Sequence, residues 1–173
     1  MTVPRRRRPG LGAVILAAGA SSRMGCRKPL LWLEAERVIE RVTGLYRALD
    51  VDPLVVLGHG ADEIRPLLEH HGVCCVRNAS PERGMLSSVQ AGVAALPAGT
   101  PAFFVHPVDV PLVRPQTLME LVNAYHRGVG TCWRPVHGGS GGHPPLFDAS
   151  WEERILDWEG ADGLRGLLQR HAG

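Results

Sequence analysis

Apolar residues follow two kinds of pattern along this chain. Short continuous apolar runs, typical of buried strands, alternate with segments in which apolar residues recur every three or four positions, typical of one helix face. The predicted strands are 13–17, 54–57, 73–76, 102–105 and 131–136. The predicted helices are 38–49, 62–68 with Asp62 as N-cap, 86–96, and 115–125 with Pro115 in the first turn. This alternation predicts an α/β fold, a single Rossmann-like three-layer α/β/α domain with a mostly parallel sheet.

Length and composition agree with one domain. The chain has 173 residues, of which 45% are hydrophobic and 21% are charged, as in ordinary globular proteins. No linker divides it, so residues 11–173 are expected to form one domain behind a disordered basic tail, residues 1–10. Arg5 to Arg8 supply four positive charges, so the net charge of +2 becomes −2 for the rest of the chain. The Arg run could contact nucleic acid or a membrane surface, but a solvated tail is the favoured interpretation. Because aromatic residues are only 5% and no apolar run approaches about 18 residues, the sequence predicts neither a nucleic-acid partner nor a membrane partner.

The most informative segment follows the first predicted strand. It reads Leu16-Ala17-Ala18-Gly19-Ala20-Ser21-Ser22-Arg23-Met24-Gly25, and Lys28 comes three residues later. A strand that leads into a loop of Gly, Ser, Arg and Lys can hold phosphates through backbone N–H groups and cationic side chains. The spacing matches neither G-x-x-x-x-G-K-[ST] nor G-x-G-x-x-G, which argues against a P-loop ATPase and an ordinary dinucleotide dehydrogenase.

The same N-terminal residues also resemble a secretory signal. Basic Arg5 to Arg8 precede an apolar stretch from Leu11 to Ala20 that ends in small residues. Cleavage there would destroy the first strand and half of the loop, and the rest of the loop would then have no explanation. The four cysteines form no C-x-x-C pair, and at least three of them are expected to be reduced and mostly buried, whereas Cys26 in the loop could be exposed. We therefore expect a cytoplasmic protein.

Unusual loops follow four of the predicted strands. In parallel sheets, ligands bind outside the carboxyl ends of the strands, so these loops are expected to converge on one crevice. After the fourth strand, Asp109 stands between Pro107 and Pro111. An Asp at a strand end often only forms a turn, but a carboxylate facing a phosphate loop also suits Mg²⁺. The helix predicted at Pro115 begins too far away for Asp109 to be its N-cap.

Two further loops carry polar candidates with open interpretations. Asn78 and Gly84 precede Ser87 and Ser88, which either contact a nucleoside or only satisfy the free N–H groups of the first helical turn. The Gly-rich loop 138–143 is either a flexible connector or a place where backbone meets a ligand.

The order of these motifs resembles the molybdenum cofactor cytidylyltransferases, within the wider nucleoside-triphosphate transferase superfamily. The resemblance rests on the segment from Leu16 to Leu31, then Gly84-Met85-Leu86-Ser87-Ser88-Val89, Asp109-Val110-Pro111 and Gly142-His143-Pro144. It covers about residues 11 to 170, nearly the whole chain. It implies an Mg²⁺-dependent enzyme that transfers CMP from CTP to the phosphate of molybdopterin and releases pyrophosphate.

The resemblance also implies a role for each matching residue. Arg23, Lys28 and Asp109 would be catalytic, with Asp109 binding Mg²⁺, and Gly142 and His143 would lie on the molybdopterin side. The nucleotide would be bound by Leu16, Ala17, Ala18, Gly19, Ser21, Ser22, Arg23, Lys28, Asn78, Gly84, Ser87 and Ser88. A molybdoenzyme or its chaperone is the implied protein partner.

Two comparisons with the family pattern refine this expectation, one about the base and one, a departure, about the C-terminal segment. Relatives that use GTP typically carry Leu-Ala-Gly-Gly in the first motif, whereas position 18 is Ala here, and its methyl group would narrow the base pocket in favour of a pyrimidine. The family usually continues into an Asp-x-Asp-Thr-Pro-type segment, whereas this sequence ends at Gly173. Asp148, Asp157 and Asp162 are the candidates for a second metal carboxylate. A non-catalytic nucleotide- or cofactor-binding accessory protein, and a transferase that uses GTP or a sugar phosphate, remain the alternatives.

Overall fold

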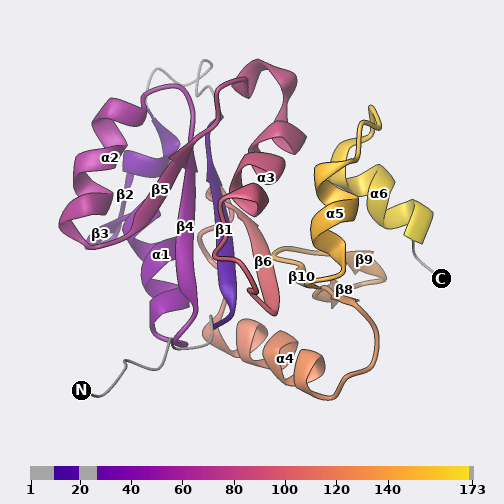
Figure 1. Cartoon of the computed structure of the whole chain (residues 1–173). Helices are drawn as coiled ribbons and strands as arrows, with labels where there is room; N and C mark the ends of the chain where they lie inside the picture. Colours follow the sequence, from indigo (N-terminus) through magenta and orange to yellow (C-terminus); the bar gives the residue numbers. More distant parts are fainter. Residues whose placement is uncertain (1–9, 20–26, 172–173) are drawn as a thin grey trace, which may run out of the picture.

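A central sheet of six strands, most of them parallel, organises the molecule (Figure 1). The computed structural model describes residues 10–19 and 27–171. The strands follow one another across the sheet in the order β5, β4, β1, β6, β10, β7. Their bounds are β1 Gly12–Ala17, β4 Asp52–Leu57, β5 Cys74–Arg77, β6 Ala102–Pro107, β7 Cys132–Trp133 and β10 Leu146–Asp148.

The first strand is the centre of this sheet. β1 pairs in parallel with β4 on one side and with β6 on the other, and all six of its residues are buried. Burial on both faces explains why its sequence is a continuous apolar run rather than an alternating one. After β1, the chain forms β4 and β5 on one side of this strand and then crosses to form β6 on its other side. The carboxyl ends of β1 and β6 therefore lie at a switch point in strand order.

Six α-helices cover the two faces of the sheet within the described residues. Helices α1, α2 and α4 pack on one face, and α3, α5 and α6 pack on the other. The helices are α1 Val38–Arg47, α2 Ala61–His70, α3 Met85–Ala94, α4 Pro115–His126, α5 Trp151–Leu156 and α6 Gly163–His171. The three-layer α/β/α prediction is therefore confirmed.

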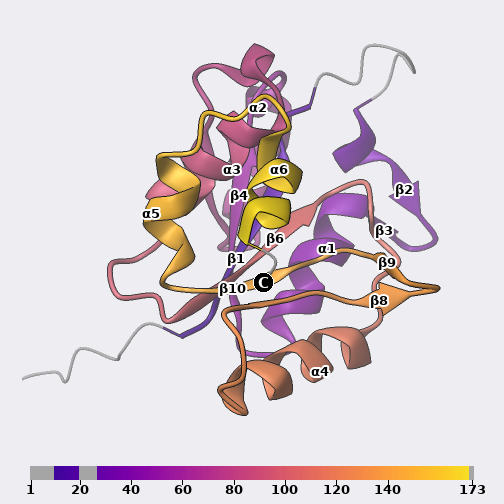
Figure 2. The same cartoon turned by 90° about the vertical axis from the view of Figure 1, so that its right-hand side faces the viewer.

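Several short elements connect these layers. Figure 2, which faces the α5 and α6 side, shows the β8–β9 hairpin projecting from the central sheet. The short elements are the 3₁₀ turns η1 Lys28–Leu30 and η2 Pro81–Arg83, the hairpin of β2 Trp32–Leu33 and β3 Glu36–Arg37, and the hairpin of β8 Val136–His137 and β9 Ser140–Gly141.

Helix α3 packs closely on the sheet and is hydrogen-bonded to the end of α5. A Cβ atom on Gly92 would lie 2.2 Å from Cγ1 of Val14, so the glycine permits this close approach. From the same helix, the Gln90 amide donates hydrogen bonds to the carbonyl oxygens of Ile155, Leu156 and Trp158. The end of α5 is therefore fixed to α3, whose first turn borders the site described below.

The structure corrects three local expectations. The segment 131–136 is not one strand, because Pro135 lacks an N–H for the ladder and the chain divides there into β7 and β8. Strand β10 was not predicted, and it pairs antiparallel with both β6 and β7. Asp62 is not an N-cap, because α2 begins at Ala61 and its N-cap is Gly60, with φ of 76°.

The described cysteines are unpaired, and their burial differs from the prediction. Cys74 is exposed, whereas Cys75 and Cys132 are half-buried. The prediction of mostly buried thiols was therefore wrong for these three residues. Cys26 lies outside the described residues. Within residues 10–19 and 27–171, no helix has the length and apolarity that crossing a membrane would require.

Candidate active site

Two adjoining cavities open at the carboxyl ends of β1 and β6. The smaller has a volume of about 280 Å³ and the larger about 1390 Å³. Both are lined by Leu16, Gly84, Met85 and Pro107, so the two spaces meet along these residues. The described residues of the four predicted loops line these two neighbouring cavities rather than one crevice, with Gly19 and Lys28 at the smaller one and residues 140–143 at the larger one.

The smaller cavity collects most of the residues expected to bind a nucleotide. Its lining includes Leu16, Ala17, Ala18, Gly19, Lys28, Pro29, Pro81, Gly84, Met85, Ser88, Pro107, Val108 and Asp109. Ser21, Ser22 and Arg23 lie outside the described residues. Asn78 and Ser87 are buried behind the lining.

Lys28 and Asp109 face each other at this cavity. The Lys28 Nζ atom lies 3.7 Å from Oδ2 of Asp109, and both side chains are about half exposed, at 46% and 53%. Lys28 opens η1, whereas Asp109 stands in the turn after β6. A cation and an anion at one open cavity can contact a phosphate chain and its counter-ion together.

Backbone hydrogen bonds hold the turn that carries Asp109. The Val108 N–H donates to the Leu16 carbonyl at 3.1 Å, which extends the pairing of β6 with β1. The Val110 N–H donates to the Pro107 carbonyl at 3.1 Å and closes the turn. Helix α4 begins at Pro115, so Asp109 is not its N-cap, as expected.

The donor set at Asp109 suits a divalent cation that is shared with phosphates. Within the described residues, no three His, Cys, Asp or Glu side chains gather into a metal site of their own. Mg²⁺ is commonly held by one or two carboxylates together with phosphate oxygens and water, so a single exposed carboxylate beside a phosphate pocket fits it. Of the three candidate second carboxylates, Asp162 lines the larger cavity, whereas Asp148 accepts hydrogen bonds from Ser150.

Asn78 organises the start of α3 from beneath. Its amide donates to the hydroxyl oxygens of Ser87 and Ser88 at 2.9 and 3.0 Å, and its carbonyl oxygen accepts the Ser80 N–H. The Ser87 hydroxyl lies within hydrogen-bond distance of the carbonyl oxygens of Ser80 and Gly84. Neither serine caps the free N–H groups of the helix, so that alternative was wrong.

Ser88 differs from its two partners because it also reaches the smaller cavity. Its oxygen accepts the Asn78 amide, which directs its own O–H away from Asn78. The Ser88 O–H can therefore donate to an acceptor other than Asn78.

Ala18 lies in the cavity lining but packs against a neighbouring strand end. A Cβ atom on Gly58 would lie 2.5 Å from the Ala18 carbonyl oxygen and 2.8 Å from its methyl carbon. Ala18 is only 3% exposed. The Ala18 methyl group exposes little surface to a ligand, so any effect on the size of the predicted base pocket would come from its packing against Gly58.

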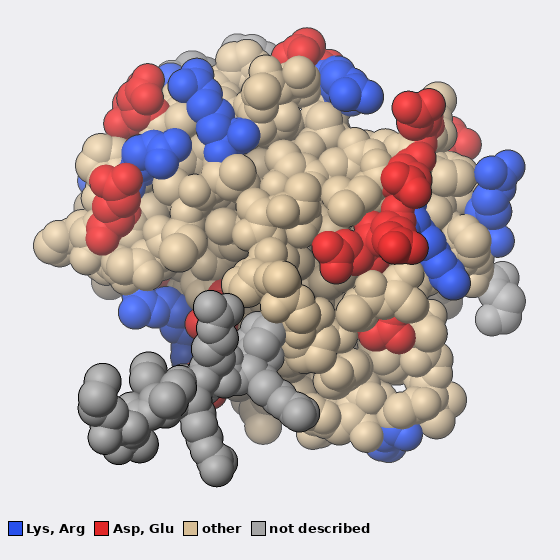
Figure 3. Space-filling model, viewed as in Figure 1, with Lys and Arg blue, Asp and Glu red and all other residues tan. Residues whose placement is uncertain are grey.

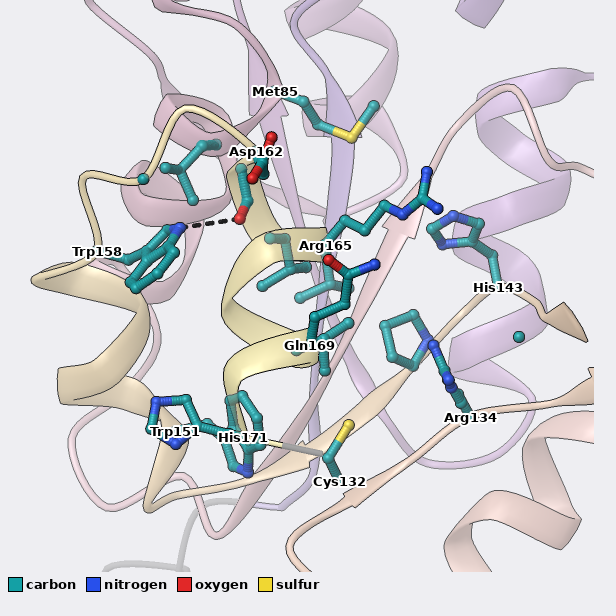
Figure 4. Close-up of a pocket in the computed structure, with 18 of the residues that line it drawn as sticks. Met85, Cys132, Arg134, His143, Trp151, Trp158, Asp162, Arg165, Gln169 and His171 are labelled. Carbon is teal, nitrogen blue, oxygen red and sulfur yellow. Dashed lines mark hydrogen bonds between the residues drawn. The ribbon is translucent and has the colours of Figure 1, made fainter. Parts of the chain in front are cut away.

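The larger cavity is bordered by charged side chains from separate segments. Its described lining includes three arginines, Arg83, Arg134 and Arg165, and two carboxylates, Glu159 and Asp162. Arg134 follows β7, Gly142 and His143 follow β9, and Arg165 belongs to α6. Figure 4 shows the Arg165 side chain extending toward His143 and Met85. Within the described residues, neither Arg134 nor Arg165 is ion-paired with a carboxylate. The excess of guanidinium groups over carboxylates in this lining favours an anionic ligand.

Two details define the walls of this larger cavity. A Cβ atom on Gly141 would lie 2.6 Å from Cζ of Arg134, so the guanidinium group lies directly over that glycine. Burial raises the pKa of the Cys132 thiol to about 11, which keeps it protonated and unsuited to act as a nucleophile. Further acidic side chains gather on the outer surface around α5 (Figure 3).

The sequence analysis missed a buried pair beneath the Asp109 turn. His106 is fully buried and lies 2.8 Å from the Tyr46 hydroxyl through Nδ1 and 2.9 Å from the Val110 carbonyl through Nε2. Burial lowers the pKa of His106. A polar residue at the end of the apolar run Ala102–Pro107 was the available signal, since buried polar groups need partners.

Comparisons with known proteins identify relatives of this chain. The bifunctional protein GlmU of Bordetella parapertussis is 37% identical over 125 residues, which cover 69% of this chain and 27% of GlmU. A second GlmU, from Paracidovorax citrulli, is 37% identical over 172 residues, which cover 92% of this chain and 32% of that protein. The chain therefore spans about a third or less of the length of these curated relatives.

Solved structures share the fold. Rv0371c from Mycobacterium tuberculosis matches with a TM-score of 0.83 at 23% identity, over 95% of this chain and 84% of that one. A nucleotidyl transferase from Methanothermobacter matches with a TM-score of 0.74 at 27% identity, over 92% and 81% of the two chains. Residues 13–173 match the family description "MobA-like NTP transferase domain". Since that match spans nearly the whole chain, the protein belongs to the MobA-like NTP transferase domain family, a family of nucleotidyltransferases.

Proposed function

We propose that this protein transfers CMP from CTP to the phosphate of molybdopterin and releases pyrophosphate. The observation that carries the proposal is the Lys28–Asp109 pair, which stands at a small cavity that opens directly into a larger one with more arginines than carboxylates in its lining. A transferase needs this layout, with one space for the donor nucleotide and a contiguous one for the acceptor.

The smaller cavity would hold the nucleotide. Leu16 to Gly19 would lie along the base and phosphates, and Lys28 together with Arg23 would bind the triphosphate. Ser88, held by Asn78, would donate a hydrogen bond from its hydroxyl group to an acceptor oxygen on the base or ribose. Ser21, Ser22, Gly84 and Ser87 complete the proposed nucleotide-binding set.

Asp109 would hold Mg²⁺ together with phosphate oxygens of the nucleotide. The bound ion would neutralise negative charge on the phosphates. A manganese complex of the related Rv0371c supports a divalent cation in this fold.

The chemistry asked of the protein is positioning and charge neutralisation. A phosphate oxygen of the acceptor attacks the α-phosphorus of CTP in line, the bond to the bridging oxygen breaks, and pyrophosphate leaves with that electron pair. Lys28 and Arg23 would hold the departing pyrophosphate, so no covalent enzyme intermediate is required.

The larger cavity would receive the acceptor. Gly142 and His143 would contact molybdopterin, and Arg134 and Arg165 add positive charge suited to its phosphate. At about 1390 Å³ the cavity exceeds the volume of a typical small-molecule pocket, which leaves room for a ring system beside the phosphate. The reaction would take place in the cytoplasm, and a molybdoenzyme or its chaperone would receive the product.

Calorimetry followed by a pyrophosphate-release assay tests the proposal. We expect CTP to bind in the presence of Mg²⁺ more tightly than GTP, and pyrophosphate to appear only when molybdopterin is added. Binding without release would favour a non-catalytic accessory protein. Release with GTP, or with glucose 1-phosphate in place of molybdopterin, would favour another transferase specificity.

A further inference from the structure

A hydrogen-bonded pair joins helix α1 to the strand that carries the Asp109 turn. Tyr46 and His106 are each 0% exposed, and their rings meet edge to face with centroids 5.6 Å apart. The hydroxyl of Tyr46 lies 2.8 Å from Nδ1 of His106. Both ring nitrogens of His106 are thus engaged, one by α1 and the other by the Val110 carbonyl.

The partners of the ring fix its tautomer. A backbone carbonyl can only accept, so Nε2 of His106 carries the proton that is donated to Val110 at 2.9 Å. In the neutral ring, Nδ1 then accepts from the Tyr46 hydroxyl. Each contact therefore has one donor and one acceptor, and rotating the ring away would leave buried polar groups without partners.

The two ends of this pair connect to the two halves of the Lys28–Asp109 contact. Val110 immediately follows Asp109, so the hydrogen bond to its carbonyl anchors the turn from the C-terminal side. Helix α1 packs against η1, the element that begins with Lys28, and the Val38 N–H donates to the Leu31 carbonyl at 2.9 Å. A continuous path therefore runs from Lys28 through α1 to Tyr46, His106 and the Asp109 turn.

We propose that Tyr46 and His106 are positioning residues that set the place of Asp109 relative to Lys28, and so the affinity of the site for the nucleotide-bound divalent cation. The proposal rests on the function proposed above. Neither residue lines the smaller cavity, so each would act only through the turn. Interactions behind a metal-binding carboxylate typically change metal affinity or activity by about 10- to 100-fold when they are removed.

Three variants separate positioning from simple burial. Tyr46→Phe removes one oxygen atom, and His106→Phe removes both polar ring atoms. His106→Gln keeps one donor and one acceptor and serves as the rescue. Tyr125→Phe is the matched control, because Tyr125 is on α4 and its ring packs against Trp133 rather than against this pair.

The first measurement is the affinity for Mn²⁺ in the presence of CTP. The electron paramagnetic resonance signal of the free ion reports how much Mn²⁺ is bound. Tyr46→Phe and His106→Phe are expected to weaken Mn²⁺ binding by about 10-fold and to lower kcat with little change in the CTP KM. His106→Gln should recover most of the affinity, and Tyr125→Phe should match the wild type. Folded Tyr46→Phe with wild-type Mn²⁺ affinity would overturn the proposal.

Amide hydrogen exchange over residues 107–111 gives a readout that needs neither metal nor turnover. The N–H groups of Val108 and Val110 are hydrogen-bonded in the wild type. Their exchange should accelerate by about 10-fold in Tyr46→Phe and remain unchanged in Tyr125→Phe. If the wild type transferred no nucleotide, the proposed function would fail, and unchanged exchange in Tyr46→Phe would separately reject the positioning role.

Discussion

The ammonium nitrogen of Lys28 lies 3.7 Å from the carboxylate oxygen Oδ2 of Asp109, although the two residues are far apart in the sequence. One belongs to the segment after β1, and the other to the turn after β6. They meet because these two strands are parallel neighbours and their carboxyl ends lie at the same edge of the sheet. Both side chains remain about half exposed, which leaves them accessible to a nucleotide.

Replacing Asp109 with Asn should abolish most of the activity. The amide keeps the shape of the side chain but removes its charge, so we expect turnover to fall by at least ~10²-fold, the scale of losing one electrostatic element. Pyrophosphate release at saturating CTP and Mg²⁺ measures this effect. Asp52→Asn is the control, because Asp52 is exposed at the start of β4, away from the strand ends that border the site. Near-normal turnover in Asp109→Asn would reject the metal-binding role.

Replacing Arg165 with Gln should weaken the acceptor specifically. Arg165 lines the larger cavity, whereas Arg170 of the same helix lies over the Trp158 ring at 5.3 Å and does not line it. We expect the acceptor KM to rise about 10-fold in Arg165→Gln, equal to the loss of about 1.4 kcal/mol from a charge-assisted contact. Steady-state kinetics with varied acceptor should show no such change for Arg170→Gln. An equal effect of both variants would mean that general charge, rather than the cavity, is responsible.

Adding a methyl group at Gly58 should disturb the nucleotide pocket. The new Cβ would lie 2.5 Å from the Ala18 carbonyl oxygen, so the backbone after β1 must shift. We expect CTP affinity, measured by calorimetry, to fall by at least ~10-fold, the scale of displacing a positioned binding group. Gly44→Ala is the matched control, because nothing lies within 4 Å of its Cβ position in α1. That control should retain CTP affinity and gain about 0.5–1 kcal/mol of stability. Unchanged CTP affinity in Gly58→Ala would show that Ala18 does not shape the pocket.

Stability should fall in mild acid because of His106. Burial lowers the pKa of this histidine, an effect that the Val110 hydrogen bond and the nearby Asp109 partly oppose and nearby His143 reinforces; Tyr46 is the other titratable neighbour. The unfolded chain therefore binds a proton at higher pH than the folded chain does. The contribution of neutral His106 to the free energy of unfolding is fully present above the unfolded-state pKa of about 6.5. It is lost as the pH falls through the lowered pKa of the folded state.

Urea unfolding at about pH 7.5 and about pH 5.5, on either side of the ordinary histidine pKa, measures this dependence. The free energy of unfolding should decrease more in the wild type than in His106→Gln, which cannot take up the proton. Other titrating groups are common to both proteins and cancel in the comparison. Equal decreases would indicate that His106 does not contribute to acid sensitivity.

The main strands were predictable because each is short, apolar and bounded by polar loops. Residues 13–17 sit at the centre of the sheet, and their continuous apolar run reports burial on both faces. The prediction of one strand over residues 131–136 was wrong, because a short sheet strand and an exposed hairpin strand are adjacent there and Pro135 divides them. The three-residue strand β10 gave too short a pattern to identify.

The site residues were also only partly predictable from the sequence. Asp109 and Lys28 could be proposed from the sequence because charged residues after apolar strands are conspicuous. Asn78, Ser87 and Ser88 were grouped correctly as neighbours, but only the structure shows that Asn78 and Ser87 lie behind the wall while Ser88 reaches the cavity. Arg134 and Arg165 were not singled out, because no spacing along the chain predicts that they border one cavity.

The sequence by itself determined the α/β class, the order of most elements and the loops that would carry chemistry. These properties depend on local periodicity and on the handedness of parallel crossovers, which act over short stretches of chain. The tertiary structure decided which side chains face a cavity, that two cavities adjoin, and that Tyr46 meets His106 beneath Asp109. Such contacts depend on how separate helices pack on the sheet, and that packing is set by the shapes of many distant side chains at once.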